Sequence, residues 1–472
     1  MFTRKQTRGK TMLVADSYAE WRKRAQEADR QSGAEEWKSI EETKRYDYKI
    51  IRRRYDELVD IRASGDPERL RYYLNEGLHG NMANMGAPIL YTKAQFGTKD
   101  LIDRYVSELV AALDDFAALP ASKVKKSDKL LSLRRASMCF GRTALMFSGA
   151  GSLGAFHLGV VKSLVQQDLL PRVLSGASAG SFVTALVGTL APEELKEKFT
   201  GRDLFELMNF QTPESSRRRV DLYDLEELMR GVLPDLTFEE AYERSGLHIN
   251  ISVAPSRVQQ RSRLLNATTA PTALIREAVL ASCAIPGLFP PVTLMARGSD
   301  GKRKPFISSR SWIDGSVLDE LPSRRLSRLY GANHFISSQA NPLMWGAAAD
   351  TEPNLWNTWT ELYQSGVRQW LRAMYPMVSQ GFRDTYPFNV MARNWFSMAT
   401  QEYAADINIQ PAARYLRRGA FYETLTPEET RALTREGERA SWPVIERIRI
   451  TTAVSRKIDE LTLSLGEDLI QP

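Results

Sequence analysis

Residues 142–190 have the sequence RTALMFSGAGSLGAFHLGVVKSLVQQDLLPRVLSGASAGSFVTALVGTL. Two short apolar runs, at 142–148 and 172–175, each end at a glycine turn. Each run is followed by an apolar segment of helical length, at 152–167 and 179–190. Strands and helices that alternate at this spacing predict parallel strands joined by crossover helices. We therefore expect an α/β fold with a mainly parallel sheet.

The same pattern continues along the chain. Further strand candidates lie at 248–254, 312–313 and 334–338. Thr237 and Glu240 have the spacing of a capping box, which predicts a helix that begins there and ends near Arg244.

The chain of 472 residues is long enough for one large core with additional regions. Apolar residues recur at helical spacing through residues 16–115, and 120–135 is a polar, lysine-bearing junction. We expect a mainly helical N-terminal region at 1–135 and an α/β core at 136–342. A mainly helical C-terminal extension at 343–472 should complete the core.

The composition excludes several classes of protein. Apolar residues make up 43% and charged residues 26%, which is typical of a globular protein and not of a disordered or fibrous one. Two cysteines, Cys139 and Cys283, are too few for a disulfide framework and favour a reducing compartment. We expect no metal and no cofactor.

The net charge and the hydropathy of the chain indicate where the protein is located in the cell and what it binds. The formal net charge of +7 fits an anionic lipid surface as well as nucleic acid. The N-terminus MFTRKQTRGKTM lacks the apolar run of a signal peptide, and no apolar stretch long enough to span a membrane follows. We expect a cytoplasmic protein that contacts a membrane or lipid droplet peripherally and has no nucleic-acid partner.

The second glycine turn contains a G-x-S-x-G pattern, Gly176-Ala177-Ser178-Ala179-Gly180. Small residues beside a serine permit a sharp strand-to-helix turn, which raises the hydroxyl above a sheet at a helix N-terminus. A plain strand-to-helix turn with Ser178 as the N-cap residue explains the same pentapeptide. Gly176, Ser178 and Gly180 are candidates for a nucleophile elbow, and the pentapeptide alone leaves both interpretations open.

The first glycine turn has the shape of a dinucleotide fingerprint. It consists of Gly149, Ala150, Gly151, Ser152, Leu153 and Gly154. Such a fingerprint needs an acidic residue about 20 positions later, at the end of the second strand. Asp168 has this distance but precedes that strand, so the nucleotide interpretation fails. The turn then offers backbone N–H groups that can bind an oxyanion forming beside Ser178.

A hydrolytic serine needs a base, and Asp314 is a candidate. It follows the apolar pair Trp312-Ile313 and precedes Gly315, which places its carboxylate at a strand end, although Asp-Gly is also common in simple turns. The chain has four histidines, His79, His157, His248 and His334. Because His334 follows Asp314, Ser178, Asp314 and His334 have the chain order of an α/β-hydrolase triad.

The segments 149–154, 176–180 and 314–315 together resemble, in order and spacing, the three signatures of the patatin-like phospholipases. The segment 281–291, ASCAIPGLFPP, is similar to the family's stretch before its catalytic aspartate. The resemblance implies a patatin-like three-layer α/β core, with helical regions before and after it.

The resemblance also assigns roles to individual residues. It implies a Ser178–Asp314 dyad in place of a triad, an oxyanion hole formed by 149–154, and a structural role for His334. Ala150 stands where many relatives have glycine, and Leu153 where many patatins have a basic residue. Both departures change side chains and leave the backbone amides intact.

The similarity is strongest to the triacylglycerol-lipase branch of plant and yeast storage-lipid breakdown, which also has bacterial members. The segments that carry it are 45–47, 77–99, 333–342 and 437–443, and the first two belong to that branch's N-terminal domain of unknown function. This resemblance predicts a hydrolase that cleaves esters of triacylglycerol or glycerophospholipid through a covalent acyl-serine. The alternatives are an esterase with the His334 triad and a catalytically idle lipid-surface protein.

Three segments are candidates for contact with lipid. Residues 354–377 contain Trp356, Trp359, Trp370 and Tyr375 among polar residues, although packing on the core explains the same pattern. Arg52-Arg53-Arg54 and Arg217-Arg218-Arg219 are basic enough to meet anionic lipid, or are simply solvated.

Overall fold

The computed structural model describes residues 15–76, 78–201, 222–256, 261–317, 319–341, 405–412, 415 and 425–470. These residues form two compact units. The first unit takes its described residues from Met1–Thr143, Ser327–His334 and Ser441–Gln471. The second takes them from Ala144–Leu326 and Phe335–Ala440.

The first unit is helical. Its helices are α2 (Tyr18–Ser32), α3 (Ala34–Ser39), α4 (Tyr48–Ser64), α5 (Pro67–Asn75), α6 (Ile89–Thr92), α7 (Asp100–Ala118), α8 (Lys126–Phe140) and α20 (Ile445–Ser464). Side-chain caps define where several of them begin: Asp47 accepts a hydrogen bond from the amide of Ile50 at the start of α4, at 3.2 Å. The helical character expected for residues 16–115 is confirmed.

The core of this unit joins segments that are far apart in the sequence. Helices α4 and α7 contribute fully buried side chains such as Ile51 and Phe116. Helix α20 contributes Ile450, Val454 and Ile458, which recur at one-turn intervals and so form one apolar stripe. The structure therefore divides the chain differently from the expected partition at 135 and 342, because α20 packs with the N-terminal helices.

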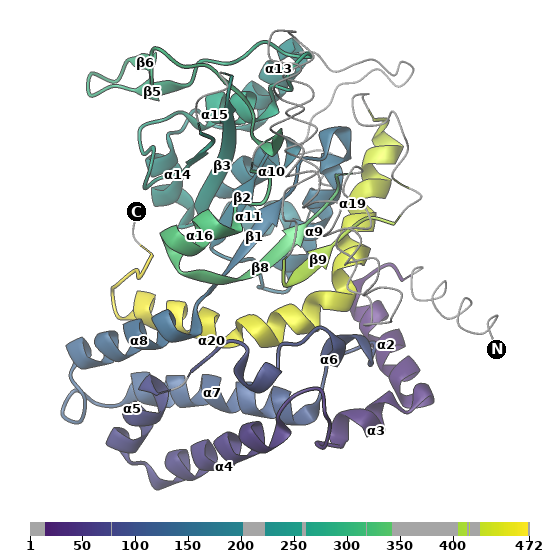
Figure 1. Cartoon of the computed structure of the whole chain (residues 1–472), viewed down its shortest axis with the longest axis vertical. Helices are drawn as coiled ribbons and strands as arrows, with labels where there is room; N and C mark the ends of the chain where they lie inside the picture. Colours follow the sequence, from purple (N-terminus) through teal and green to yellow (C-terminus); the bar gives the residue numbers. More distant parts are fainter. Residues whose placement is uncertain are drawn as a thin grey trace, which may run out of the picture. The chain divides into compact units, whose positions relative to one another are not determined.

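The second unit contains most of the central sheet, whose described strands follow the order β4-β3-β2-β1-β8-β9, with β7 also paired to β3 (Figure 1). The strands are β1 (Arg142–Phe147), β2 (Val173–Gly176), β3 (His248–Pro255), β4 (Arg263–Leu265), β7 (Trp312–Asp314), β8 (Ala332–Ser338) and β9 (Ile407–Ile409). The pairs β1–β2, β2–β3 and β8–β9 are parallel, whereas β4 and β7 run antiparallel to β3. The mostly parallel sheet confirms the expected α/β fold.

Helices surround this sheet (Figure 1). They are α9 (Ala155–Gln166), α10 (Ala179–Gly188), α11 (Pro192–Gly201), α13 (Leu222–Val232), α14 (Phe238–Ser245), α15 (Ile275–Cys283), α16 (Ser323–Tyr330) and α19 (Pro427–Ser441). A separate hairpin pairs β5 (Met295–Arg297) with β6 (Arg303–Pro305). The capping box of Thr237 and Glu240 is present at the start of α14, as expected. Within the described ranges no helix is both long and apolar enough to cross a membrane.

Candidate active site

Ser178 lies in the turn between β2 and α10, with the backbone angles φ 52° and ψ −127°. A residue other than glycine is strained in this region, which is characteristic of functional turns. The turn also needs its two glycines, because a Cβ on Gly176 would lie 2.2 Å from the Gly180 oxygen and one on Gly180 would lie 2.4 Å from the Phe147 oxygen. The structure thus gives residues 176–180 the shape of a nucleophile elbow.

Neighbouring serines hold the backbone of the elbow. The amide of Ser178 donates to Ser282 Oγ at 3.0 Å, and the Ser282 hydroxyl donates to the Ser252 carbonyl at 2.7 Å. The Ser181 hydroxyl donates to the Ser178 carbonyl at 2.6 Å. These bonds occupy the backbone groups of Ser178, so its strained conformation is fixed by buried partners.

Asp314 ends β7 and is buried, with 2% of its surface exposed. Strand β7 pairs with β3, and the Asp314 amide donates to the Ala284 carbonyl at 2.9 Å. The chain turns at once because Gly315 is packed against β3, where a Cβ would lie 2.0 Å from the Ser252 oxygen. The strand end predicted for Asp314 is confirmed.

The carboxylate of Asp314 has a raised pKa of about 6, mainly because burial disfavours its charged form. Hydrogen bonds to the carboxylate oppose this rise. The Ser316 amide and hydroxyl donate to Oδ1 at 2.8 Å and 2.7 Å, and the neighbouring Ser178 hydroxyl also lowers the pKa of the carboxylate. The carboxyl group of Asp314 is therefore a weaker acid than that of an exposed aspartate, and it lies beside the hydroxyl of Ser178.

The glycine-rich turn at 149–154 follows β1 and lies beside the elbow. A Cβ on Gly149 would lie 3.4 Å from the Ser178 Cβ, and one on Gly154 would lie 3.1 Å from the Ala179 Cβ. Residues Gly151–Gly154 form a short 3-10 helix, in which the Leu153 amide donates to the Ala150 carbonyl at 3.0 Å. The structure thus brings all three predicted motifs together.

Two buried side chains near this turn were not predicted as part of the site. Glu320 accepts a hydrogen bond from the Gly149 amide at 2.8 Å, and His157 Nε2 lies 3.1 Å from the Ser148 carbonyl. The only sequence signal for these two residues was weak, namely their proximity to the predicted motifs. Glu320 lies six residues after Asp314, and His157 lies three residues after Gly154.

His334 lies at the other end of the strands. Its Nδ1 is 3.0 Å from the Thr143 hydroxyl, at the amino end of β1, whereas Ser178 follows the carboxyl end of the parallel strand β2. The six residues of β1 span about 20 Å. The structure therefore does not assemble the Ser178, Asp314 and His334 triad.

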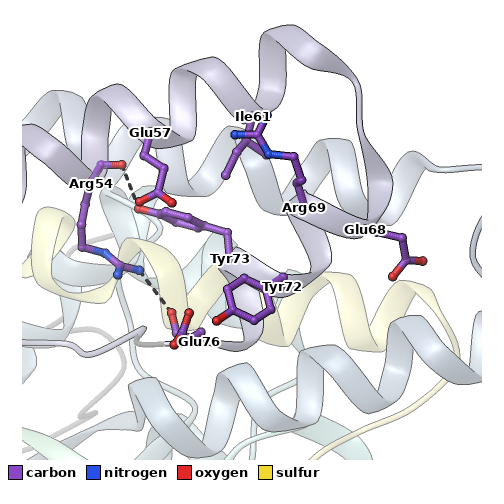
Figure 2. A pocket seen from close by; sticks show the side chains of 8 residues that line it. All are labelled: Arg54, Glu57, Ile61, Glu68, Arg69, Tyr72, Tyr73 and Glu76. Carbon is purple, nitrogen blue, oxygen red and sulfur yellow. Dashed lines mark hydrogen bonds between the residues drawn. The ribbon is translucent and has the colours of Figure 1, made fainter.

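A pocket of about 420 Å³ lies within the first unit and contains none of the predicted catalytic residues (Figure 2). Two of its charged groups bond nearby groups: Arg54 donates to the backbone oxygen of Glu76 at 3.2 Å, and Arg69 pairs with Asp60 at 3.2 Å. The Tyr73 hydroxyl donates to the Arg54 carbonyl at 2.9 Å. Arginine, glutamate and tyrosine side chains dominate the lining of this pocket.

Fold and site together define an α/β protein with a strained elbow serine, a buried aspartate and an adjacent glycine-rich turn. Residues 145–326 match the family profile of patatin-like phospholipases, and residues 2–137 match a domain of unknown function, DUF3336. The chain belongs to the patatin-like phospholipase family.

The similar proteins carry consistent names. Triacylglycerol lipase ptl3 of Schizosaccharomyces pombe is 30% identical over 464 residues, which cover 94% of each chain. Triacylglycerol lipase 4 of Saccharomyces cerevisiae is 32% identical over 92% of this chain and 50% of its own length. Triacylglycerol lipase SDP1L of Arabidopsis thaliana is 29% identical over 96% of this chain and 58% of its own. The chain thus spans little more than half the length of the latter two relatives.

Proposed function

We propose that this protein is a lipid acyl hydrolase that cleaves carboxylic esters of triacylglycerol, glycerophospholipid or both. The observation that carries the proposal is the Ser178 hydroxyl beside the buried Asp314 carboxylate, whose pKa is raised to about 6 by burial although this hydroxyl lowers it. The names of the relatives, triacylglycerol lipases from two yeasts and a plant, support the substrate class.

In the first half of the reaction, Asp314 accepts the hydroxyl proton of Ser178 while Oγ attacks the ester carbonyl carbon. The bond between the carbonyl carbon and the alcohol oxygen then breaks, and the proton on Asp314 passes to the departing alkoxide. An acyl-serine and a free alcohol result. A pKa near 6 keeps the carboxylate ionised at neutral pH while making it a better base than an exposed aspartate.

The second half repeats the same transfers with water. Water loses a proton to Asp314 and attacks the acyl carbon, after which the bond to Ser178 Oγ breaks and Oγ regains the proton. The fatty acid leaves. In both halves a negative charge develops on the carbonyl oxygen, and we assign the backbone amides that follow Gly149, beginning with Ala150 and Gly151, to its stabilisation.

A lipid hydrolase must meet a lipid surface, and two of the segments expected to do so, 354–377 and 217–219, lie outside the described residues. The third, Arg52-Arg53-Arg54, is less available than expected. Arg52 pairs with Glu41 and Asp56, and Arg54 donates to the Tyr105 hydroxyl at 3.3 Å.

We assign lipid contact in the first unit to the outer face of α8. Leu131 and Met138 lie two turns apart on it and are 42% and 81% exposed. Exposed basic side chains lie on the helix and just before it, namely Lys123, Lys125, Lys126 and Arg135, whereas Arg134 pairs with Glu467. Apolar side chains among positive charges are suited to an anionic lipid surface.

The test is release of labelled fatty acid from triolein and from phosphatidylcholine, assayed in parallel. We expect Ser178→Ala and Asp314→Ala to lower the rate by about 10³-fold or more, because nucleophile and base act as one unit. His334→Ala should remain close to the wild type per folded molecule. A folded His334 variant without activity would restore the triad, and a wild-type protein that floats with emulsions but releases no acid would indicate an idle lipid-binding protein.

A further inference from the structure

The peptide group between Ser148 and Gly149 is held on both sides by buried side chains. Its N–H donates to Glu320 Oε1 at 2.8 Å, and its carbonyl oxygen lies 3.1 Å from His157 Nε2. This peptide is the one through which the chain leaves β1 and enters the glycine-rich turn. Its orientation therefore determines the direction of the turn.

Glu320 has no exposed surface. Its Oε1 also accepts a hydrogen bond from Asn341 Nδ2 at 3.1 Å. Burying a carboxylate away from water is costly, and hydrogen bonds from Gly149 and Asn341 offset part of that cost. A buried acid that is bonded in this way is rigid, and an apolar residue of its size would leave the Gly149 amide without this acceptor.

His157 completes the arrangement from the opposite side. It too has no exposed surface, and burial lowers its pKa to about 4, so the ring is neutral at pH 7. One tautomer satisfies both neighbours: Nε2–H donates to the Ser148 carbonyl, and Nδ1 accepts from the Ser338 hydroxyl at 2.6 Å.

We infer that Glu320 and His157 are positioning residues that orient the oxyanion-binding amides of the glycine-rich turn. A peptide group is planar, so fixing its N–H and its carbonyl together fixes the plane from which the next residues start. Donors that are oriented before the reaction stabilise the developing charge without rearrangement. Because the Gly149 amide already donates to Glu320, the amides that meet the oxyanion are those that follow it.

The same short segment also holds the base. Asp314 and Glu320 stand six residues apart between β7 and α16, and they contact Ser178 and Gly149 respectively. One piece of chain thereby sets the position of both the base and the oxyanion turn relative to the nucleophile. This inference rests on the proposed function and adds two residues to its machinery.

The test compares Glu320→Leu with Glu320→Gln on a soluble short-chain ester. Loss of the acceptor should lower kcat by about 10²-fold with little change in KM, because the displaced amides act mainly in the transition state. Glutamine keeps an oxygen that accepts from Gly149 and Asn341, so we expect it to restore most of kcat. The pH at which activity is half maximal should stay near 6 in both variants, since Asp314 remains the base.

Glu436→Leu is the matched control, because Glu436 is also buried and accepts a backbone amide, that of Ala412, at 3.0 Å. Each rate is divided by the concentration of sites that react with a fluorescent phosphonate, which corrects for unfolded protein. Equal loss in Glu320→Leu and Glu436→Leu, a change in KM alone, or a Glu320→Gln variant as slow as Glu320→Leu would overturn the inference. If the wild type itself does not turn over, the proposed function fails instead.

Discussion

The pKa of Asp314 links the burial of one residue to the pH dependence of the proposed reaction. Only the ionised carboxylate can accept the Ser178 proton, so the rate should rise with pH through about 6 and then level off. Burial has raised the pKa above the ordinary aspartate range, and the hydrogen bonds from Ser316 limit that rise.

Removing the hydroxyl of Ser316 should shift the pH at which the rate rises to its plateau. In Ser316→Ala the carboxylate loses a 2.7 Å hydrogen bond that stabilises its charged form, so the pKa of Asp314 should rise further. We expect the half-maximal pH to increase by up to about one unit, with little loss on the plateau. Ser311→Ala, which removes a hydroxyl bonded to Ser256, is the control. A half-maximal pH that falls or stays fixed in Ser316→Ala would contradict the assignment of Asp314 as the base.

The backbone strain at Ser178 should be measurable as lost stability. Its φ of 52° and ψ of −127° suit glycine, and a side chain in such a region costs about 1–3 kcal/mol. Ser178→Gly and Ser178→Ala should both be inactive, but the glycine variant should be more stable by about 1 kcal/mol after allowance for its more flexible unfolded chain. Thermal unfolding of the two variants is the measurement, and equal midpoints would show that the turn is relaxed.

Glu320 and His157 show which residues of the site are hard to predict from sequence. Ser178, Asp314 and the glycine-rich turn lie in short motifs whose residue types carry the chemistry. Glu320 acts on Gly149, 171 positions away, so its role depends on a contact that only the folded sheet creates.

Among the secondary-structure elements, those with strong local signals were predicted well. Strands β1 and β2 are apolar runs that each end at a glycine turn, and the helices α9 and α10 that follow them are long enough to show apolar periodicity. Strands β4 and β9 were missed because each has only three residues and exists through pairing with a longer neighbour.

The proposed contact between α8 and lipid predicts that reversing the basic charges at the start of this helix weakens binding to anionic vesicles. Lys125→Glu with Lys126→Glu should weaken binding to vesicles that contain phosphatidylserine by at least about tenfold, since each basic residue near an anionic surface contributes about 1 kcal/mol. Binding is measured by cosedimentation in the Ser178→Ala background, which prevents hydrolysis.

Lys302→Glu with Lys304→Glu is the matched control, because it reverses the same number of exposed charges at β6. The control should bind phosphatidylserine vesicles like the parent, and neither double variant should differ from it on neutral phosphatidylcholine. Equal weakening by both double variants would assign the effect to net charge and not to α8.

The core of the first unit includes α20, which lies far from the N-terminal helices in the sequence. Ile458 has no exposed surface within the core that α20 shares with α4 and α7, so Ile458→Ala should destabilise the first unit by about 2–5 kcal/mol. Amide hydrogen exchange should accelerate in α4 and α7. Leu164→Ala in α9, also fully buried, should instead affect the second unit. Faster exchange confined to α20 would show that it is not part of this core.

The packing of α20 with the N-terminal helices was not predicted from the sequence, because the apolar periodicity of a helix does not identify the helix against which it packs. The apolar stripe of α20 marks it as a packed helix, and the region after residue 343 was therefore expected to complete the α/β core. Only the contacts with α7 and α8 place it with the N-terminal helices.

The position of α20 in the chain also has a consequence for synthesis on the ribosome. The N-terminal helices of the first unit are translated before the second unit, but α20, which contributes to their core, follows it. Until α20 has been synthesised, the apolar faces of α7 and α8 therefore lack one of their packing partners. We expect the nascent chain to expose apolar surface during that interval, so that the first unit completes its core only after α20 has been synthesised.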